Sequence, residues 1–419
     1  MKNNIFLLIA ASIFILSFSS CDDLLDVTPK DKITPETFFS TEADLQAFST
    51  NFYNSLPKDR DLYKDDADNI THSTPNSAAT DSRTVPASGG GWEWGYLRRF
   101  NTLLQYSVNC KDKTVRTRYQ ALTRFFRAYF YFEMVKRFGD VPWYDTELFV
   151  SETDQLNKPR DSRELVMKNI LEDLDFAITN LSTTPSVYTV TKWTALSLKS
   201  RVCLFEGTFR KYHNLNLSTN ADFFLQESIT ASRELMKESN YTLYTEGGTN
   251  QAYRKLFTSQ NAPTTEVIMA RNYNLTYDIY NTVGTYHTSV GEGRPGVTRK
   301  IIASYLMNDG SRFTDNPNWE TMTFVDECKN RDPRLTQSIC TPSYQPIVSN
   351  RKNIPDLNAC VTGYQLIKYE DEAVGGKSDI DLFYFRLAEV YLNYAEALAE
   401  INQLTQDDWI FLSINCATV

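Results

Sequence analysis

The feature that most constrains this fold is a series of long segments in which apolar residues recur at helical spacing. The clearest covers residues 115–138, where aromatic and aliphatic side chains return every three or four positions. It stops at Gly139, a residue type that commonly ends helices, and Pro142 follows shortly after. A second segment, 163–181, carries its apolar side chains in one stripe, as an amphipathic helix does. Both patterns predict long helices that pack through one face.

Further helices are predicted on either side of these two. They cover residues 37–56, 94–109, 191–209, 221–238 and 382–399. Most follow one another in pairs, and small residues such as Ala121, Ala128 and Ala195 lie where a neighbouring helix must approach closely. The sequence therefore predicts a mainly α fold built from tetratricopeptide-like helix hairpins, although no strict repeat period is present.

Two regions lack this periodicity. Residues 58–91 are rich in Asp, Asn, Ser, Thr and Pro and end in three consecutive glycines, which predicts a long loop. Residues 241–363 are punctuated by Gly, Pro, Asn and Thr, which predicts irregular loops with a few short strands such as 266–271. Loops as long as 58–91 inside a compact domain are usually functional, so we expect a function for that loop.

The composition excludes some function classes. Hydrophobic residues make up 42% of the chain and charged residues 23%, which is enough to build a packed core. The formal net charge of −9 argues against a nucleic-acid partner, which requires a basic face. Aromatic residues reach 13%, so the chain needs either a large aromatic core or an aromatic-lined surface.

The N-terminus has the pattern of a bacterial lipoprotein signal. A lysine precedes an apolar run at 5–18, and two serines precede Cys21. This pattern predicts a signal peptide over 1–20, lipidation of Cys21, and a polar tether over 21–36 that lifts the domain off the membrane. A plain secretory signal with an incidental cysteine is the alternative, because Phe18 stands where Leu is usual. No later apolar run is long enough to span a bilayer.

The remaining cysteines form no metal-binding pattern. None of the six makes a Cys-x-x-Cys pair, and the three histidines lie far apart in the sequence. We therefore expect no metal site and no cofactor. These cysteines are either free buried thiols or form a disulfide or two, and their spacing does not decide between the two.

Several blocks of the sequence match one known pattern when they are taken together. They are 121–142 (ALTRFFRAYFYFEMVKRFGDVP), 193–209 (WTALSLKSRVCLFEGTF), 330–335 (NRDPRL) and 385–397 (FRLAEVYLNYAEA), with LLDVTP at 24–29 near the lipoprotein start. With these motifs, in this order, the chain resembles the SusD/RagB family of outer-membrane nutrient-binding lipoproteins. The resemblance extends from Cys21 to about Asp408.

The resemblance implies a domain over 37–408 in which helix pairs support an irregular binding face. It implies a non-enzymatic protein that captures an oligosaccharide or polysaccharide, or in some members a peptide, and acts as a lid on a SusC-like TonB-dependent transporter. Cys21 would anchor it in outer-membrane lipid, facing the cell exterior. Asp22 and Asp23, directly after that cysteine, resemble the surface-export tag of Bacteroidetes-type lipoproteins.

Sugar binding points to the segment around Trp92 and Trp94. A sugar ring offers an apolar C–H face and a polar rim, so its binders combine exposed aromatic rings with carboxylates, amides or Arg. The two tryptophans follow a glycine run that lets the backbone turn their rings outward, or else one of them is a core residue that fixes the next helix. Asp66, Asp68 and Arg83 in the preceding loop are candidates to bond hydroxyls, or are simply solvated.

Tyr286 and Trp319 are further candidates from the irregular half. Trp319 ends a polar Asp-Asn-Pro-Asn loop, which makes exposure of its ring plausible.

A surface glycoside hydrolase is the enzyme alternative. Such an enzyme needs two carboxylates across the scissile bond, and Glu93 with Asp66 or Asp68 would supply them. No block resembles a hydrolase signature, a nucleophile motif or a phosphate loop, so no catalytic residue is predicted. A passive helical scaffold for protein partners is the third class, and it would not need exposed tryptophans.

The last residues, 409–419, match nothing in the family, whose members continue with further helices. With one choice of synonymous codons, a single base inserted after the codon of Asp408 makes the chain read DLDISINKLRDR from Asp408 onward, which resembles the family's next helix. We therefore expect 409–419 to be an aberrant tail that arose from a one-base deletion, either genuine or a sequencing error. The family's remaining C-terminal helices would then be missing, which would leave apolar faces uncovered.

Overall fold

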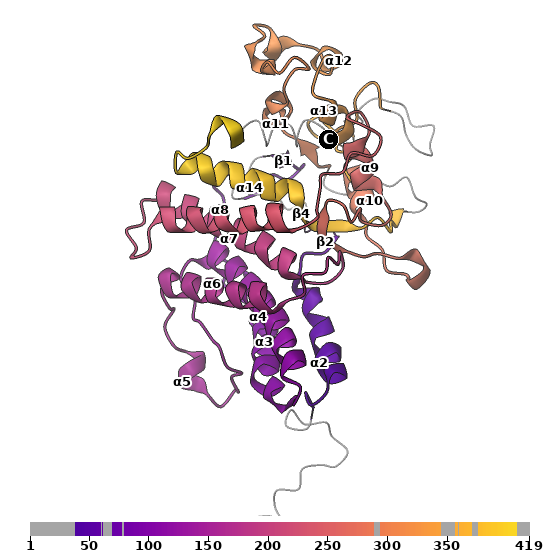
Figure 1. Cartoon of the computed structure of the whole chain (residues 1–419). Coiled ribbons are helices and arrows are strands. Elements are labelled where there is room, and N and C mark those ends of the chain that lie inside the picture. The colour runs from indigo at the N-terminus through magenta and orange to yellow at the C-terminus, as the bar shows by residue number, and fades with distance from the viewer. Residues whose placement is uncertain are drawn as a thin grey trace, which may run out of the picture.

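The computed structural model describes residues 38–59, 61, 69–77, 79–288, 294–344, 357–358, 360–370 and 376–408. Helices dominate these residues, and the strands are short (Figure 1). The predictions for the signal peptide, Cys21, Asp66, Asp68 and the tail at 409–419 lie outside them. Within the described ranges, no helix is both long enough and apolar enough to cross a bilayer.

Long helices stacked side by side make up the N-terminal half. They are α2 (Glu42–Ser49), α3 (Gly95–Tyr106), α4 (Lys113–Phe138), α6 (Arg163–Asn180), α7 (Lys192–Tyr212) and α8 (Ala221–Glu238). Each packs on the next from α3 to α4, α6, α7 and α8, and α14 (Leu387–Glu400) returns from late in the chain to cover α8 and α7 (Figure 1). The predicted mainly α class with tetratricopeptide-like helix pairs is confirmed.

Local sequence fixes where these helices begin, end and approach one another. The Asp112 carboxylate caps α4 by accepting hydrogen bonds from the N–H groups of Thr114 (2.9 Å) and Val115 (3.0 Å). Gly139 ends α4 with φ at 71°, a conformation that costs other residues strain. A Cβ on Gly207 of α7 would lie 2.6 Å from Cγ of Leu225 of α8, so glycine allows this pair of helices to meet closely.

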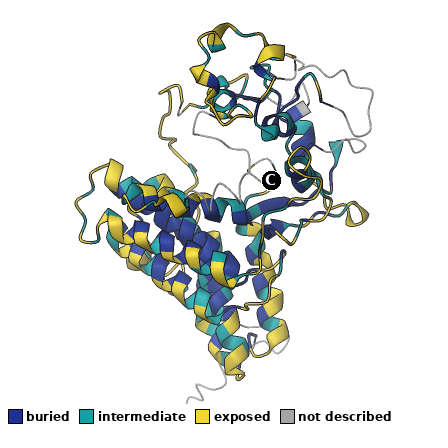
Figure 2. Cartoon of the chain, turned by 45° about the horizontal axis from the view of Figure 1, so that its top comes forward, coloured by how far each residue is buried: buried dark blue, intermediate teal, exposed yellow. Residues whose placement is uncertain are grey.

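The helical core is largely aromatic. Burial follows the inner faces of the stacked helices, and exposed residues gather on their outer faces and ends (Figure 2). Phe52, Phe100 and Phe126 show the packing: the Phe52 ring lies nearly perpendicular to Phe100 at a centroid distance of 4.8 Å and tilted against Phe126 at 5.9 Å. The rich aromatic content of the chain is therefore used mostly inside the fold.

Buried ion pairs join neighbouring helices within this core. Arg163 of α6 and Arg210 of α7 both bind Glu206, each at 2.6 Å, and all three side chains are buried. Arg127 of α4 binds Asp173 of α6 through two hydrogen bonds of 2.6 and 2.8 Å. Such buried pairs stabilise the folded protein only when both charges are present, because removing one leaves the other buried without compensation.

The second half is irregular and holds two small antiparallel sheets. β1 (Ile70–Thr71) pairs with β3 (Gly296–Val297), and β2 (Val267–Arg271) pairs with β4 (Leu382–Arg386). Short helices lie among the loops: α9 (Ala252–Thr258), α10 (Val283–Thr288), α11 (Arg299–Ser304), α12 (Phe324–Glu327) and α13 (Pro333–Ser338). The β1–β3 pair fastens the loop after α2 onto this half.

Several element boundaries differ from the predictions. The predicted helix at 382–399 begins only at Leu387, because the five residues before it form β4 and hydrogen-bond to β2. The predicted helix at 37–56 is split into α2 and a 3₁₀ turn, η2 (Thr50–Ser55). The strand predicted at 266–271 is confirmed as β2.

Candidate functional site

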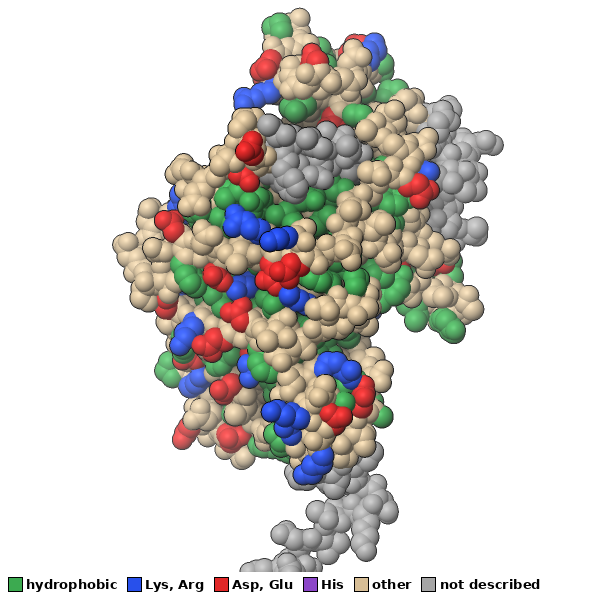
Figure 3. All heavy atoms as spheres, in the orientation of Figure 1, with side chains coloured by type: hydrophobic (Ala, Val, Ile, Leu, Met, Phe, Trp, Pro, Cys, Tyr) green, Lys and Arg blue, Asp and Glu red, His purple; other side chains and the backbone are tan. Residues whose placement is uncertain are grey.

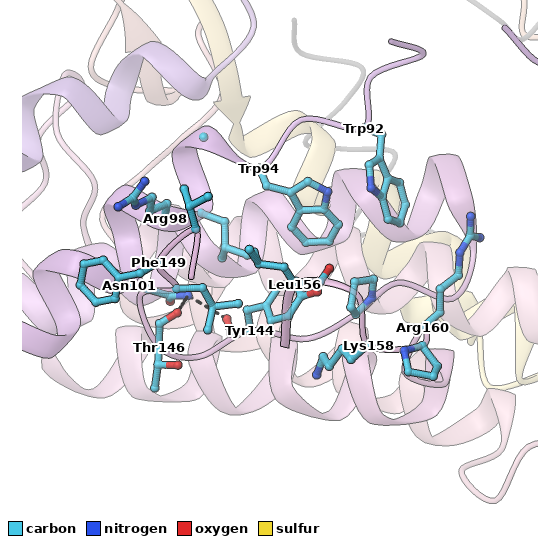
Figure 4. Close-up of a pocket in the computed structure, with 16 residues that line it drawn as sticks. Trp92, Trp94, Arg98, Asn101, Tyr144, Thr146, Phe149, Leu156, Lys158 and Arg160 are labelled. Carbon is cyan, nitrogen blue, oxygen red and sulfur yellow. Dashed lines mark hydrogen bonds between the residues drawn. The ribbon is translucent and has the colours of Figure 1, made fainter. Parts of the chain in front are cut away.

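A groove runs between the start of α3 and the connection from α4 to α6, with a volume of about 580 Å³ (Figure 4). We call it the Trp92 groove. Its wall on the α3 side is formed by Trp92, Trp94, Gly95, Leu97, Arg98 and Asn101, and its facing wall by Pro142, Tyr144, Thr146, Leu148, Phe149, Val150, Leu156, Lys158, Pro159 and Arg160. The lining is mainly aromatic and aliphatic, with a few polar groups between, as in many small-molecule sites.

A glycine turn presents Trp92 at this groove. Gly89, Gly90 and Gly91 all have positive φ, at 75°, 70° and 83°. A Cβ on Gly91 would also meet Nε of Arg137 at 3.0 Å, so a larger residue is disfavoured there on both counts. The turn ends just before α3 and sets the two tryptophans on the groove wall.

The two tryptophans occupy different environments. Trp92 is 38% exposed, and its ring stands nearly perpendicular to Phe138 (centroids 4.8 Å apart) and to Trp94 (5.0 Å). Trp94 lies deeper and packs against the rings of Phe130 and Tyr144, at 5.7 and 5.6 Å. Of the two alternatives considered for these residues, the core environment fits Trp94 and the presented ring fits Trp92.

Asn101 fixes the facing wall in place. Its amide nitrogen donates to the carbonyl oxygens of Tyr144 (3.0 Å) and Thr146 (2.9 Å), and its amide oxygen accepts from Arg127 (3.3 Å). The Tyr144 N–H donates in turn to the buried hydroxyl of Tyr131 (2.6 Å), whose pKa burial raises. A connection without helical periodicity is thereby tied to α3 and α4.

The charged residues that line the groove are all basic. Arg98 pairs with Glu147 at 3.2 Å, and Lys158 pairs with Asp161 at 2.8 Å. Burial raises the pKa of the Asp161 carboxyl, but hydrogen bonds from Lys158 and the Trp143 N–H outweigh this and hold it below its ordinary value. Arg160 donates to the carbonyl oxygens of Phe138 and Asp140, and its guanidinium lies over the Trp92 ring at 5.1 Å.

The structure does not gather the other predicted residues into this groove. Arg83 is exposed in the preceding loop, and Glu93 is exposed; neither is among the residues that line the groove. The Tyr286 hydroxyl hydrogen-bonds the His72 ring in the irregular half. No sequence pattern predicts Tyr144, Phe149 and Arg160 as site residues, because their connection carries only the turn signal of Pro142.

Trp319 lines a separate cavity of about 570 Å³, which we call the Trp319 cavity. The other residues that line it are Arg299, Lys300, Ala303, Ser304, Leu306, Arg312 and Thr314. The guanidinium of Arg299 lies 5.2 Å from the Trp319 ring centroid and donates to the Trp319 carbonyl oxygen at 2.8 Å. The predicted exposure of this ring is therefore partial, because Arg299 packs on it.

A metal-binding cluster does not occur in the part of the chain that the structure describes, where no three His, Cys, Asp or Glu residues are suitably grouped. The described cysteines are thiols that make no disulfide with one another: Cys110, Cys203, Cys328, Cys340 and Cys360.

Two family models match consecutive parts of this chain. The model described as "SusD family" matches residues 256–415, and the model described as "Starch-binding associating with outer membrane" matches residues 23–204. The chain belongs to the SusD/RagB family. The resemblance inferred from the sequence blocks is thereby confirmed.

Individual members of the SusD/RagB family show how far the similarity extends. The SusD-like protein P38 of Formosa agariphila is 25% identical over 416 residues, which cover 93% of this chain and 76% of that protein. The SusD-like protein P25 of the same organism is 23% identical over 47% of this chain and 42% of its own length. These relatives support a shared family and leave the ligand of this chain open.

Solved SusD-like structures share the fold. A SusD-like protein from Bacteroides fragilis superposes with a TM-score of 0.72 at 22% identity, covering 93% of this chain and 81% of its own. A SusD-like carbohydrate-binding protein from the same species gives 0.70 at 20% identity, covering 91% and 80%. A structure solved with a xylogluco-oligosaccharide gives 0.58 at 18% identity, covering 84% and 70%.

Proposed function

We propose that this protein is a cell-surface lipoprotein that binds glycans at the Trp92 groove and delivers oligosaccharides to a SusC-like TonB-dependent transporter. The observation that carries the proposal is Trp92, a residue that lines the groove directly after the glycine turn and is 38% exposed. Support comes from the family models and from the fold shared with carbohydrate-binding structures.

The groove suits the chemistry of a sugar ring. An aromatic face such as that of Trp92 covers the apolar C–H face of a pyranose, and this burial contributes on the order of 1–2 kcal/mol per ring. Donors at the rim, such as Arg160, then bond the hydroxyl groups. Because Asn101 and Tyr131 fix the facing wall, little ordering of the protein would accompany binding.

Binding without cleavage is part of the same proposal. Hydrolysis of a glycosidic bond requires an acid and a second carboxylate across the bond. None of the described residues that line the Trp92 groove is an Asp or a Glu. Glu93, the residue considered for this role, is exposed beside the groove rather than among its lining residues.

The test combines a binding and a cleavage assay. Purified protein should migrate more slowly in native gels that contain a polysaccharide that it binds than in gels without it. A non-binding protein of similar size should migrate equally in both gels. Long incubation with the same polysaccharide should release no new reducing ends. Steady release of sugar that disappears in a Glu93→Gln variant would replace this proposal with a hydrolase.

A further inference from the structure

The charged residues that line the Trp92 groove and the Trp319 cavity are all cations. They are Arg98, Lys158 and Arg160 in the groove, and Arg299, Lys300 and Arg312 in the cavity. The whole chain has the opposite balance, with 52 acidic and 43 basic residues. Basic and acidic side chains are interspersed on the face that Figure 3 shows. A third cavity differs in this respect, because the carboxylate residue Glu389 lines it together with Lys368 and Arg386.

Part of this charge is already neutralised within the protein. Glu147 pairs with Arg98, and Asp161 pairs with Lys158, behind the groove wall. Arg160 is the remaining groove cation, and its guanidinium donates to two main-chain carbonyl oxygens, those of Phe138 and Asp140. In the described part of the chain, no carboxylate lies within ion-pair distance of Arg160.

The Trp319 cavity has the same arrangement. Arg299 pairs with the buried carboxylate of Glu327 and packs on the ring of Trp319. Lys300 and Arg312 are exposed at the same cavity. Neither makes an ion pair within the ranges that the structure describes.

The described residues that line the Trp92 groove and the Trp319 cavity include no carboxylate, and their side-chain acceptors are Asn101 and the hydroxyls of Tyr144, Thr146, Ser304 and Thr314. Neutral sugar hydroxyls both donate and accept, so sites for them usually mix carboxylates or amide oxygens with Arg and Lys. Asn101 supplies the amide in the groove, but its oxygen already accepts from Arg127 and its nitrogen donates to Tyr144 and Thr146. A ligand that brings its own anionic acceptors fits these walls better.

We propose that the glycan bound by this protein carries carboxylate or sulfate groups, which meet Arg160 in the Trp92 groove and Arg312 with Lys300 in the Trp319 cavity. The inference rests on the proposed glycan-binding function and narrows its substrate class. Arg binds both anions through paired N–H donors, and Lys binds them as a point charge. The aromatic ring beside each cation set covers the C–H face of the same sugar.

The experiment measures the affinity of the full chain for three hexasaccharides by calorimetry. Hexagalacturonic acid carries carboxylates, an ι-carrageenan hexasaccharide carries sulfates, and cellohexaose is neutral. At least one acidic probe should bind at least about tenfold more tightly than cellohexaose, and raised salt should weaken that binding. The acidic probe that binds identifies the anion.

Charge variants locate the contact. Arg160→Gln and Arg312→Gln should each weaken the acidic probe by about tenfold, the effect of losing a charge-assisted hydrogen bond of about 1.4 kcal/mol. Arg160→Lys should recover part of that loss. Lys168→Gln is the matched control: Lys168 is 70% exposed, pairs with Glu172 on α6, and lines neither cavity. It changes the net charge equally and should leave affinity unchanged.

The two proposals fail in different ways. Cellohexaose binding that equals or exceeds that of both acidic probes, and that Trp92→Ala abolishes, would overturn the acidic-glycan inference and leave glycan binding intact. An equal loss in Lys168→Gln would also overturn it, because the effect would then follow net charge alone. Failure of all three probes would count against both proposals.

Discussion

The guanidinium of Arg160 lies 5.1 Å from the centroid of the Trp92 ring. Phe138 and Trp94 meet the same ring at nearly perpendicular angles, so three neighbours hold the indole without burying it. A ring fixed in this way loses little side-chain entropy when a sugar packs on it. The pair thus combines an apolar surface with a charged donor in one place.

The tryptophans should separate binding from stability. Trp92→Ala should weaken glycan affinity by about tenfold, for a loss on the order of 1–2 kcal/mol, and leave the melting temperature nearly unchanged. Trp94→Ala should lower the free energy of unfolding by about 3 kcal/mol, because its ring packs among Phe130 and Tyr144. Calorimetry and denaturant unfolding measure the two effects. Normal binding by Trp92→Ala would place the glycan elsewhere, with Trp319 the next residue to change.

Asn101 should act on the groove without touching the glycan. Asn101→Ala removes both bonds to the facing wall and the acceptor of Arg127, which should cost about 2 kcal/mol of stability. The connection at 142–160 should then become more sensitive to limited proteolysis, and affinity should fall. Asn51→Ala is the control, since Asn51 accepts one exposed bond from Arg99. Equal proteolysis of the two variants would contradict the positioning role.

Glu206 should be essential to the helical core. Glu206→Gln leaves the buried guanidinium of Arg163 without its counter-charge and leaves Arg210 with Glu164 as its remaining carboxylate partner, and it should cost about 3–5 kcal/mol. The exposed pair of Lys168 and Glu172 offers the comparison, and Glu172→Gln should change stability by no more than about 0.5 kcal/mol. Urea titrations would measure both, and similar values would mean that the buried network contributes little.

Acid should destabilise the protein in part through His287. Burial, together with the charge of His72, lowers the pKa of His287 to about 3 from its ordinary value of 6.5. The unfolded chain therefore takes up this proton as pH falls below 6.5, while the folded chain does not until pH 3. The stability of the wild type relative to His287→Gln should decline by at most about 1.4 kcal/mol per pH unit across that window. Parallel pH profiles for the two proteins would exclude this account.

Cys21 should carry the lipid. Cys21→Ala should release a soluble form into the periplasm, and the native protein should be cut by protease added to whole cells. The measurement needs a known surface protein as a positive control. A native protein that survives where that control is cut would refute exposure on the cell exterior.

How much of this could be predicted from the sequence depended on whether the signal was local. The long helix α4 was predicted to within two residues, because its apolar period and its stop at Gly139 both lie within its own sequence. The helix predicted at 382–399 wrongly includes β4, because the pairing of this strand with β2 depends on residues far away in the chain. Tertiary pairing there overrides local preference.

The same division holds for the candidate site. Trp92 and Trp94 were found from the glycine run beside them, which is a local signal. Tyr144, Phe149 and Arg160 were not, because their connection has no period and is placed by Asn101 and Tyr131. Tyr286 and Trp319 lie apart from the Trp92 groove, since each contacts its own partners in the irregular half.

The short ladder between β1 and β3 has a consequence for the order of folding. Ile70 pairs with Val297, and the Asn69 carbonyl oxygen accepts from the Thr298 N–H at 2.8 Å. Contacts between such distant positions close late, because the chain entropy of a long loop must be lost first. Because a polypeptide is made from its N-terminus, the strand at residue 70 cannot pair until residue 297 has been synthesised. The loop that leads to Trp92 can therefore be fixed at its β1 end only after the chain has been made as far as β3.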